Sequence, residues 1–302
     1  MYDVVIVGAG PAGITASIYA ARKKMNLLVI SQNIGGQTIW SADIENYTGY
    51  QFITGIELGQ KFREHLEQFD VEVKEGETVT RVEKSGDAIE IETDRGNYTA
   101  RSVIVASGRV PRRLNVPGEE ELRNRGVTYC ATCDGPVFAG KDVAIIGGGN
   151  SALEATLQMM KIATHVYVFE ATPSFSADLV MMDKARASKK VSMFTNAKVA
   201  RIRGDKLVSG IEVEIEGKLK QFDVKGVLIE IGSSPASDFV KDVEKNQSGE
   251  IVVNCKCETN VPGIFAAGDV TNVYAKQIVV ACGEGAKAAL AAFEYLSTKP
   301  HK

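Results

Sequence analysis

Short hydrophobic runs rich in β-branched residues recur along the chain, and stretches with helical periodicity follow several of them. This alternation predicts parallel β-sheets whose strands are joined by crossover helices, which is an α/β fold. We expect strands at 4–7, 27–30, 103–106, 143–146, 166–169, 226–231 and 264–267.

The pattern restarts about halfway along the chain, where segment 143–147 (VAIIG) repeats the strand and glycine of segment 4–8 (VVIVG). One repeat at this distance indicates a duplicated nucleotide-binding fold, so we expect two Rossmann-like domains. Each half also contains a stretch in which hydrophobic and polar residues alternate, at 70–99 and at 198–224. Such alternation predicts antiparallel strands, in the first half at 72–74, 79–83 and 88–93.

Two breaks marked by glycine and proline divide the chain, at 109–111 and at 232–235. A chain of 302 residues also exceeds what one hydrophobic core usually serves. We therefore expect the second domain to be inserted in the first. The expected boundaries are 1–112 for the first part of the first domain, 113–242 for the inserted domain and 243–302 for the return.

The charge balance argues against two classes of partner. With 35 basic and 38 acidic residues the formal net charge is −3, too even to indicate binding to nucleic acid or to an anionic membrane. The sequence has no apolar run long enough to span a bilayer and no signal segment at its start, so we expect a cytoplasmic protein. In that reducing compartment the 5 cysteines are not expected to form structural disulfides.

The first glycine motif, Gly8-x-Gly10-x-x-Gly13, follows an apolar strand and opens a helix of small residues at 14–21. Its glycines permit the tight turn, the approach of a pyrophosphate and close helix packing, while the helix N-terminus favours the anion. The next strand ends in the neutral segment 31–33, so the group that would hold the ribose stays open. The candidate binding residues here are Gly8, Gly10, Pro11, Ala12 and Gly13.

The second motif, Gly147-x-Gly149-x-x-Ala152, is followed by a strand that ends at Glu170. A carboxylate at this position accepts hydrogen bonds from both ribose hydroxyls and repels a 2′-phosphate, and segment 170–176 contains no lysine or arginine. The sequence therefore favours NADH over NADPH, although Glu170 could also be an ordinary solvated strand end. The candidate residues are Gly147, Gly149, Asn150, Ser151, Ala152 and Glu170.

A cysteine pair lies between the two motifs, at Cys130 and Cys133, and Asp134 follows it. The C-x-x-C spacing favours a stabilised, reactive thiolate, and Asp134 could shuttle a proton or serve only as a helix N-cap. A zinc site would need two more ligands, and the one-residue gap of Cys255-x-Cys257 is unlike zinc spacing, so we expect no metal. Two nucleotide motifs around a dithiol indicate a flavin-linked electron path.

The remaining chemistry lies near the C-terminus. Asp269 follows a strand, at the sheet edge where ligands of α/β folds bind, and suits a flavin ribityl chain. Segment 276–278 begins a helical stretch whose N-terminal amides could face a reduced flavin. We expect Cys255, Cys257 and Cys282 to be packed small residues.

These residues resemble the low-molecular-weight thioredoxin reductases and, more closely, the F-type flavoproteins of alkyl hydroperoxide reductases. The resemblance covers nearly the whole chain. Beyond the motifs above it rests on Gly35-Gly36-Gln37, Glu45-Asn46-Tyr47, Tyr129 to Gly135, Cys257 to Asn260 and Lys276-Gln277-Ile278.

The resemblance implies roles for individual residues. The glycine motif at 8–13 would hold FAD, Cys133 would lie over the flavin, Cys130 would exchange with a partner disulfide, and Asp134 would be the acid. It further implies a homodimer and a rotation of the inserted domain. A basic cluster of NADPH-dependent reductases is absent at 170–176, which agrees with the NADH-using F-type flavoproteins. The other FAD-binding positions are Gly36, Gln37, Asn46, Gly108, Gly268, Asp269, Lys276, Gln277 and Ile278.

We therefore expect an NADH-dependent, FAD-containing protein-disulfide reductase whose partner is a thioredoxin- or glutaredoxin-like protein with a C-x-x-C disulfide. Because the sequence starts directly at the FAD fold, this acceptor is expected on another polypeptide, and a peroxidase downstream of it stays open. Two alternatives remain. One keeps the dithiol but uses another donor, such as ferredoxin; the other is a non-catalytic redox sensor.

Overall fold

The computed structural model describes residues 1–40, 44–129 and 131–298. The chain divides into two compact units, unit 1 with Met1–Val110 and Ser234–Lys302, and unit 2 with Pro111–Ser233. Unit 2 is thus inserted in unit 1. The two connecting segments, β7 (Arg109–Pro111) and β16 (Ser233–Pro235), pair with one another as a short sheet.

The second boundary lies earlier than the expected position 242. The segment after β16 already packs in unit 1, because Val240 is buried there and forms a bridge with Val82. Glycine and proline at 232–235 mark the crossing itself, whereas the following polar residues carry no signal of a return to unit 1.

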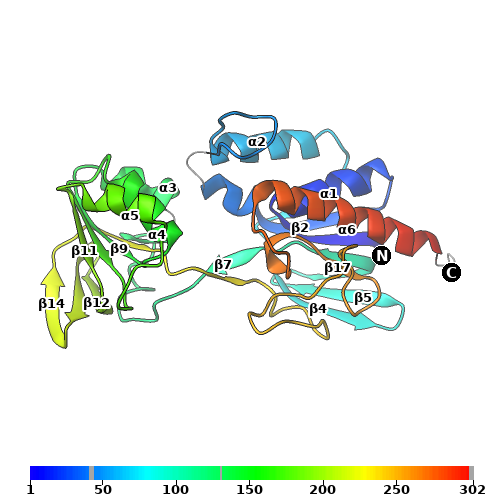
Figure 1. Cartoon of the computed structure of the whole chain (residues 1–302). Coiled ribbons are helices and arrows are strands. Elements are labelled where there is room, and N and C mark those ends of the chain that lie inside the picture. Colours follow the sequence, from blue (N-terminus) through cyan, green and yellow to red (C-terminus); the bar gives the residue numbers. More distant parts are fainter. Residues whose placement is uncertain (41–43, 130, 299–302) are drawn as a thin grey trace. The chain divides into compact units, whose positions relative to one another are not determined.

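Unit 1 is built on a seven-stranded sheet with the order β3-β2-β1-β6-β5-β4 and with β17 paired to β6 (Figure 1). The long strand β6 pairs antiparallel with β5 through its first half and parallel with β17 through its second half. The elements of this unit are β1 (Tyr2–Ala9), α1 (Pro11–Arg22), β2 (Leu27–Ile34), η1 (Gly36–Trp40), α2 (Gly55–Leu66), β3 (Glu72–Glu75), β4 (Val79–Ser85), β5 (Ala88–Thr93), β6 (Asn97–Val105), β17 (Ile264–Ala266), η3 (Gly268–Val270) and α6 (Ile278–Thr298).

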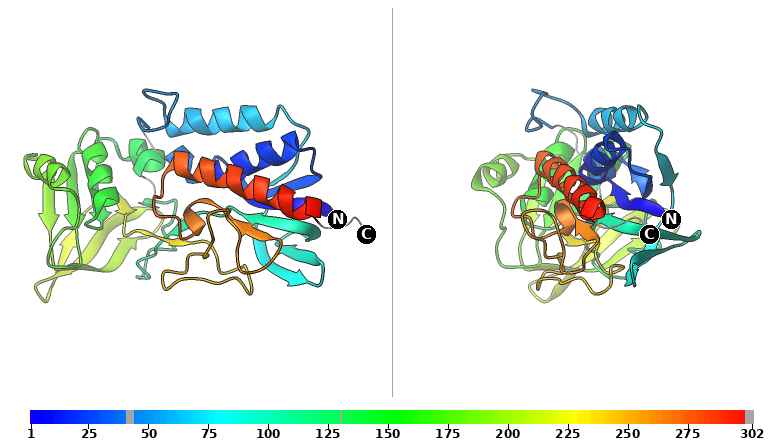
Figure 2. Two further views of the ribbon diagram at one scale, coloured as in Figure 1. Left: turned by 45° about the vertical axis from the view of Figure 1, so that its right-hand side comes forward. Right: turned by 90° about the vertical axis from the view of Figure 1, so that its right-hand side faces the viewer.

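Alternate residues of the central strands enter two separate cores of unit 1. Val4 and Ile6 pack with α1 and α6 on one face, and the two helices run side by side in both views of Figure 2. Val5 and Val7 pack on the other face with β4, β5 and the segment before β17. Both faces are covered, which explains why β1 is a nearly continuous hydrophobic run.

Unit 2 repeats this plan around a five-stranded parallel sheet of order β11-β10-β9-β15-β8. Helices α4 and α5 cover one face, and an antiparallel sheet of β12, β13 and β14 covers the other. The elements are β8 (Val127–Thr128), α3 (Ala131–Asp134), η2 (Gly135–Phe138), β9 (Asp142–Ile146), α4 (Asn150–Met159), β10 (His165–Phe169), α5 (Leu179–Arg186), β11 (Val191–Phe194), β12 (Ala197–Gly204), β13 (Val208–Ile215), β14 (Lys218–Phe222) and β15 (Gly226–Ile229).

The α/β class and all seven expected parallel strands are confirmed. The expected antiparallel pairing is confirmed for β4, β5 and β12 to β14, but for β3 it is wrong. Strand β3 pairs parallel with β2, from Leu28 opposite Glu72 to Ser31 opposite Glu75. The reason is that α2 lies between these strands and returns the chain in the same direction.

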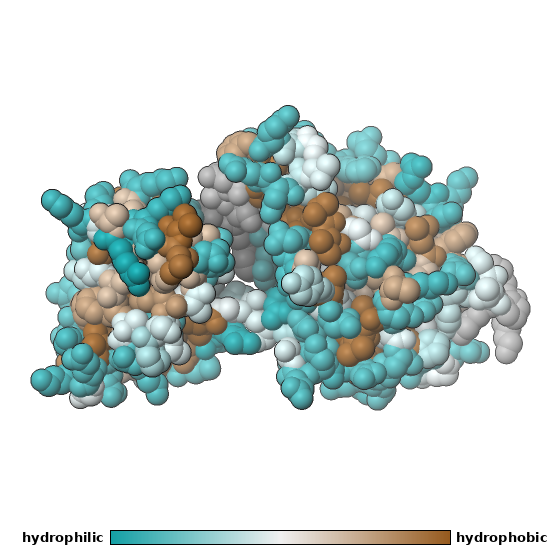
Figure 3. All heavy atoms as spheres, viewed as in Figure 1, coloured by the Kyte–Doolittle hydropathy of each residue, from teal (hydrophilic) through white to brown (hydrophobic). Residues whose placement is uncertain are grey.

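Hydrophilic side chains cover most of the face in Figure 3, and hydrophobic ones form small separate patches. Large apolar side chains that are exposed include Leu179 and Val180 on α5 and Val279 and Leu290 on α6. Single exposed residues of this kind are normal for folded proteins. Over the described part of the chain, we find no helix with the length and hydrophobicity needed to cross a bilayer.

Candidate active site

The first glycine motif forms a turn that admits no side chain at two positions. Gly8 has φ of +101°, and a Cβ there would lie 2.4 Å from the carbonyl oxygen of Ala106. A Cβ on Gly13 would lie 1.8 Å from the carbonyl oxygen of Gly8. The turn between β1 and α1 therefore depends on glycine, and it presents the N-terminus of α1 at the carboxyl edge of the sheet.

Close contacts bring two distant segments to this turn. Gly268 has φ of +76°, and a Cβ there would lie 3.0 Å from Cβ of Ala12. Gly285 of α6 approaches so closely that a Cβ would lie 2.0 Å from the carbonyl oxygen of Ala12. Small residues thus allow η3 and α6 to meet the start of α1, which places Asp269 at the same edge.

The loop after β2 closes this edge from another direction. A Cβ on Gly36 would lie 2.9 Å from Cα of Gly10, and the Gly36 amide donates to Oδ1 of Asn33. The side chain of Gln37 donates to the backbone carbonyl of Arg109. Thr38 is buried, and its hydroxyl has no hydrogen-bond partner among the described residues. A buried hydroxyl without a partner is costly and suits a ligand group.

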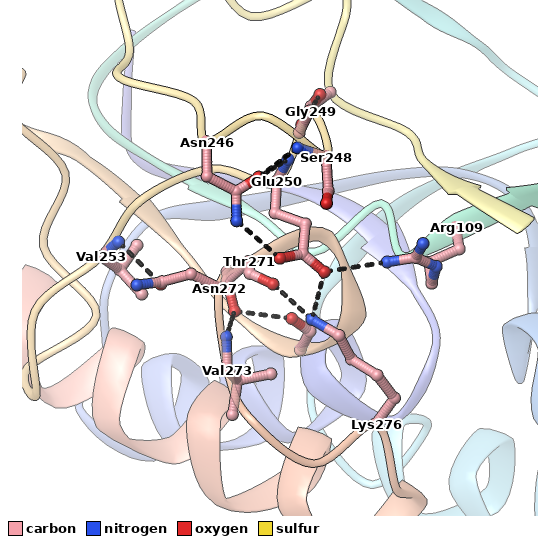
Figure 4. A network of polar contacts seen from close by, with 12 residues as sticks. Arg109, Asn246, Ser248, Gly249, Glu250, Val253, Thr271, Asn272, Val273 and Lys276 are labelled. Atoms are coloured by element: carbon pink, nitrogen blue, oxygen red, sulfur yellow. Dashed lines mark hydrogen bonds and ion pairs between the residues drawn. The ribbon is translucent and has the colours of Figure 1, made fainter.

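Four charged side chains surround the end of β17. Burial raises the pKa of the half-buried Asp269, and the positive charges of Lys276 and Arg109 partly oppose this effect. Both cations bind one carboxylate, that of Glu250, with Nη1 of Arg109 at 3.1 Å and Nζ of Lys276 at 3.0 Å from Oε1 (Figure 4). The sequence motifs include Asp269 and Lys276, whereas no motif includes Glu250 or Arg109.

Polar contacts also hold the start of α6. The side chain of Asn46 donates to Oε1 of Gln277 at 3.1 Å, immediately before the helix begins at Ile278. Burial raises the pKa of the neighbouring Tyr47 to about 12, and the charge and hydrogen bond of Cys282 add to this shift. Asn46 therefore meets the predicted pair Gln277 and Ile278, although it lies 231 positions before Gln277 in the sequence.

The remaining predicted position in unit 1, Gly108, lies in the chain between β6 and β7. It has φ of +67°, and its backbone carbonyl accepts from the amide of Ala236. No heavy atom lies within 4 Å of a Cβ built at Gly108. Its glycine is therefore explained by backbone conformation rather than by crowding.

The second glycine motif has its strand-end acid folded directly over it. Gly147 has φ of +133°, and a Cβ there would lie 2.2 Å from the carbonyl oxygen of Glu230. At Gly148 a Cβ would lie 2.3 Å from Oε2 of Glu170. The amide of Thr172 donates to Oε1 of Glu170 at 2.7 Å, which fixes the carboxylate in this position. Its Oε2 thus lies beside the turn where a nucleotide ribose would bind.

The start of α4 is tied to the segment that follows Glu170. Asn150 donates from Nδ2 to Oδ2 of Asp178, and the amide of Asp178 donates back to Oδ1 of Asn150 at 2.9 Å. Gly149 is the N-cap of α4, and Ser151 and Ala152 lie in its first turn. A second carboxylate thus stands close to Glu170 in the sequence, and segment 170–178 contains no basic residue. This site is acidic.

The second cysteine of the pair lies in the short helix α3. Cys130 lies outside the described residues, and for Cys133 only the backbone, in α3, is described. Asp134 ends α3, and its carboxylate accepts a hydrogen bond from the hydroxyl of Thr128. Nε2 of Gln158 donates to the carbonyl of Ala131 at 3.3 Å, which fastens the start of α3 to α4. The C-x-x-C segment thus adjoins the helix that carries the second glycine motif.

Two acidic residues near this segment were not predicted. Burial raises the pKa of Glu230 to about 7, opposed by a hydrogen bond from the amide of Ala131 and increased by the charge of Glu154. Glu119 is 3% exposed, and its Oε1 accepts from the hydroxyl of Tyr129 at 2.6 Å. Glu230 lies far from the cysteines in the sequence, and Glu119 lies in a polar run. No local pattern therefore identifies either acid.

The other cysteines differ from one another. Cys257 is fully buried, and burial together with the nearby Glu284 carboxylate raises the pKa of its thiol to about 12. Cys255 is exposed, so its expected packing is wrong. Oδ1 of Asn254 accepts from the amides of Lys256 and Glu258, and this tight turn leaves the side chain of Cys255 outside the core. No group of acidic, cysteine or histidine side chains within the described ranges could hold a metal.

Comparison with known proteins agrees with this geometry. Residues 2–285 match the family described as pyridine nucleotide-disulphide oxidoreductase. The chain is 43% identical over 303 residues to the F component of alkyl hydroperoxide reductase from Escherichia coli K12, and the match covers 98% of this chain and 58% of that protein.

Two solved structures are similar over almost the full length of both chains. Thioredoxin reductase from Lactococcus lactis, in its FR conformation, is 36% identical with a TM-score of 0.89, covering 99% of this chain and 100% of that one. Thioredoxin reductase from T. acidophilum is 37% identical with a TM-score of 0.85, covering 97% and 98%. The chain therefore belongs to the pyridine nucleotide-disulphide oxidoreductase family, as a flavoprotein oxidoreductase of the thioredoxin reductase type.

Proposed function

We propose that this protein is an NADH-dependent, FAD-containing disulfide reductase that delivers electrons through Cys130 and Cys133 to a thioredoxin- or glutaredoxin-like protein. The observation that carries the proposal is the pair of glycine turns, one in each unit, of which the second adjoins the C-x-x-C segment and has Glu170 folded over it. Family membership supports electron transfer to a disulfide by a flavoprotein, and Glu170 supports NADH as the electron donor.

The residues of unit 1 fit FAD. The turn at Gly8 and Gly13 leaves room for a pyrophosphate at the N-terminus of α1, and the buried Thr38 hydroxyl offers a hydrogen bond that no described residue uses. Asp269 stands at the carboxyl edge to accept from hydroxyl groups of the cofactor, and Gln277 stands at the start of α6. When bound, FAD accepts a hydride from a nicotinamide and releases two electrons to a disulfide.

The residues of unit 2 fit a nicotinamide nucleotide without a 2′-phosphate. The Thr172 amide holds Glu170 so that its free oxygen can accept from ribose hydroxyls. A 2′-phosphate would meet this carboxylate with no basic residue in segment 170–178 to compensate it. We therefore favour NADH over NADPH.

The dithiol step follows ordinary thiol–disulfide exchange. The Cys130 thiolate attacks one sulfur of the partner disulfide, forming a mixed disulfide and releasing the other partner sulfur as a thiolate. Cys133 then attacks Cys130, which releases the second partner thiolate and leaves a Cys130–Cys133 disulfide. In this proposal Asp134, whose carboxylate accepts from the Thr128 hydroxyl, supplies the proton that a departing thiolate requires.

The dithiol also needs a protein that accepts its electrons. The chain spans 58% of the length of the Escherichia coli relative, so the activity of that whole protein is not transferred to it. The sequence contains one C-x-x-C pair. We propose that a small C-x-x-C carrier takes the electrons, and that a peroxidase is reduced through such a carrier rather than directly.

Coupled turnover tests this proposal. The purified protein with NADH should reduce a thioredoxin-like carrier, and peroxide consumption by a disulfide peroxidase should accelerate strongly when the carrier is added. A Cys130→Ser variant, as the matched control, should retain flavin reduction by NADH but lose carrier reduction. Rapid peroxidase turnover without any carrier would contradict the assignment of the acceptor, and absence of disulfide reduction with any acceptor would favour a redox sensor.

A further inference from the structure

Glu250 forms the centre of a polar network in unit 1 that no motif predicts (Figure 4). Its Oε2 accepts from Nδ2 of Asn246 at 2.8 Å, while its Oε1 accepts from both Arg109 and Lys276. The side chains of Glu250 and Arg109 are each 17% exposed, and that of Lys276 is 26% exposed. One carboxylate thus pairs with two partly buried cations.

The network is fixed by further contacts with the loop that follows Asp269. Nζ of Lys276 also donates to the backbone carbonyl of Thr271, and the Thr271 hydroxyl donates to the carbonyl of Gly268 at 2.8 Å. Burial alone would raise the pKa of Glu250, but the hydrogen bonds from Asn246 and Lys276, with the charge of Lys276 and the bond from Arg109, hold it below its usual value. Glu250 is therefore ionised at neutral pH.

The charges of this cluster reach the ligand edge of the sheet. Lys276 and Arg109 both lie close enough to Asp269 to lower the pKa of its carboxyl. Removal of Glu250 would make this cluster one unit more positive, and removal of Arg109 would make it one unit more negative, in a poorly solvated place.

We propose that Glu250 is a positioning residue that sets the reduction potential of the flavin by screening Arg109 and Lys276. This inference rests on the proposed FAD site at Asp269. Reduction of flavin by two electrons and one proton adds a negative charge, so a change that makes the nearby cluster more positive favours the reduced form. A Glu250→Gln variant therefore has a higher potential, and an Arg109→Gln variant a lower one.

The test measures the midpoint potential of the bound flavin by anaerobic equilibration with a reference dye. All proteins carry Cys130→Ser and Cys133→Ser, so that only the flavin accepts electrons. We expect Glu250→Gln to shift the flavin equilibrium threefold to tenfold toward the reduced form, roughly 15 to 30 mV for a two-electron couple. We expect Arg109→Gln to shift it oppositely, and the double variant Arg109→Gln/Glu250→Gln to return near the starting value.

The matched control is Asp3→Asn, which breaks the partly buried Asp3–Arg101 pair at the opposite, amino end of β1. It should leave the potential unchanged. Unchanged potentials, shifts of the same sign, or loss of flavin from both single variants would show that the network is only structural and overturn the inference. Absence of FAD from the protein without these substitutions would instead overturn the proposed function.

Discussion

The two glycine turns share their backbone geometry but differ in the charge that surrounds them. In unit 2, Glu170 lies directly over Gly148, with one oxygen held by the Thr172 amide. In unit 1, the corresponding strand end carries Ser31 and Asn33, which the loop itself uses: Ser31 accepts from the Ala9 amide and Asn33 from the Gly36 amide.

This difference separates two tasks that a nucleotide site performs. The turn supplies amides and space for phosphates, and it can be the same in both units. We propose that selectivity comes from side chains outside the turn, which are the carboxylate of Glu170 in unit 2 and the charged cluster around Glu250 in unit 1. On this proposal, charge distinguishes between nucleotides that both turns could accept.

The largest expected effect is on disulfide turnover, and it distinguishes the role of the cysteine pair from the roles of the two glycine turns. Cys130→Ser and Cys133→Ser should each lower disulfide turnover by about a thousandfold or more, because each removes a sulfur that the exchange requires. Flavin reduction by NADH should persist in both variants, and Cys133→Ser should also alter the flavin spectrum. Stopped-flow absorbance with and without carrier measures this. Retained carrier reduction in either variant would assign the relay to another thiol.

The next effect distinguishes the turns from one another. Gly13→Ala places a Cβ 1.8 Å from the Gly8 carbonyl oxygen and should abolish FAD retention, whereas Gly147→Ala places one 2.2 Å from the Glu230 carbonyl oxygen and should abolish reduction by NADH with FAD retained. Gly283→Ala is the control, since no heavy atom lies within 4 Å of a Cβ there and alanine favours a helix. If both turn variants lost FAD, the assignment of separate nucleotides would fail.

A smaller effect concerns Glu170 alone. Glu170→Ala should lower kcat/KM for NADH about tenfold and leave NADPH unaffected or improved, because hydrogen bonds to a charged group contribute about 1.5–3 kcal/mol. Steady-state kinetics with both nucleotides measures the ratio. Glu214→Gln, on an exposed position of β13, is the control and should change neither value. An unchanged ratio in Glu170→Ala would make Glu170 an ordinary strand end.

The smallest expected effect concerns the stability of the fold and its dependence on pH, at Glu230. Burial raises the pKa of its carboxyl from 4.5 to about 7, so the folded state binds a proton that the unfolded state releases. Stability from this group is complete below pH 4.5 and is lost as pH rises toward about 7. Glu230→Gln should remove this slope and stabilise the protein at pH 8 by about 1–2 kcal/mol. Denaturant unfolding at several pH values measures it, and an unchanged slope would reject this account.

The sequence predicted those features of the fold that depend on residues close to one another in the chain. Both glycine turns, Glu170 and the strands of the two sheets follow from residues that are near in sequence. The direction of β3 did not, because pairing depends on the crossover through α2 rather than on alternation. Glu250 could not be predicted either: its partner Arg109 is 141 positions away, and only the fold brings the two together.

Anaerobic titration of the purified flavoprotein with NADH, and separately with NADPH, tests the central claim most directly. We predict that NADH bleaches the flavin at the lower concentration, and that full reduction takes about two equivalents per flavin, one for the dithiol and one for the flavin. The Cys130→Ser variant should take about one equivalent. Equal or better reduction by NADPH would contradict the role of Glu170, and reduction by neither nucleotide would point to another donor.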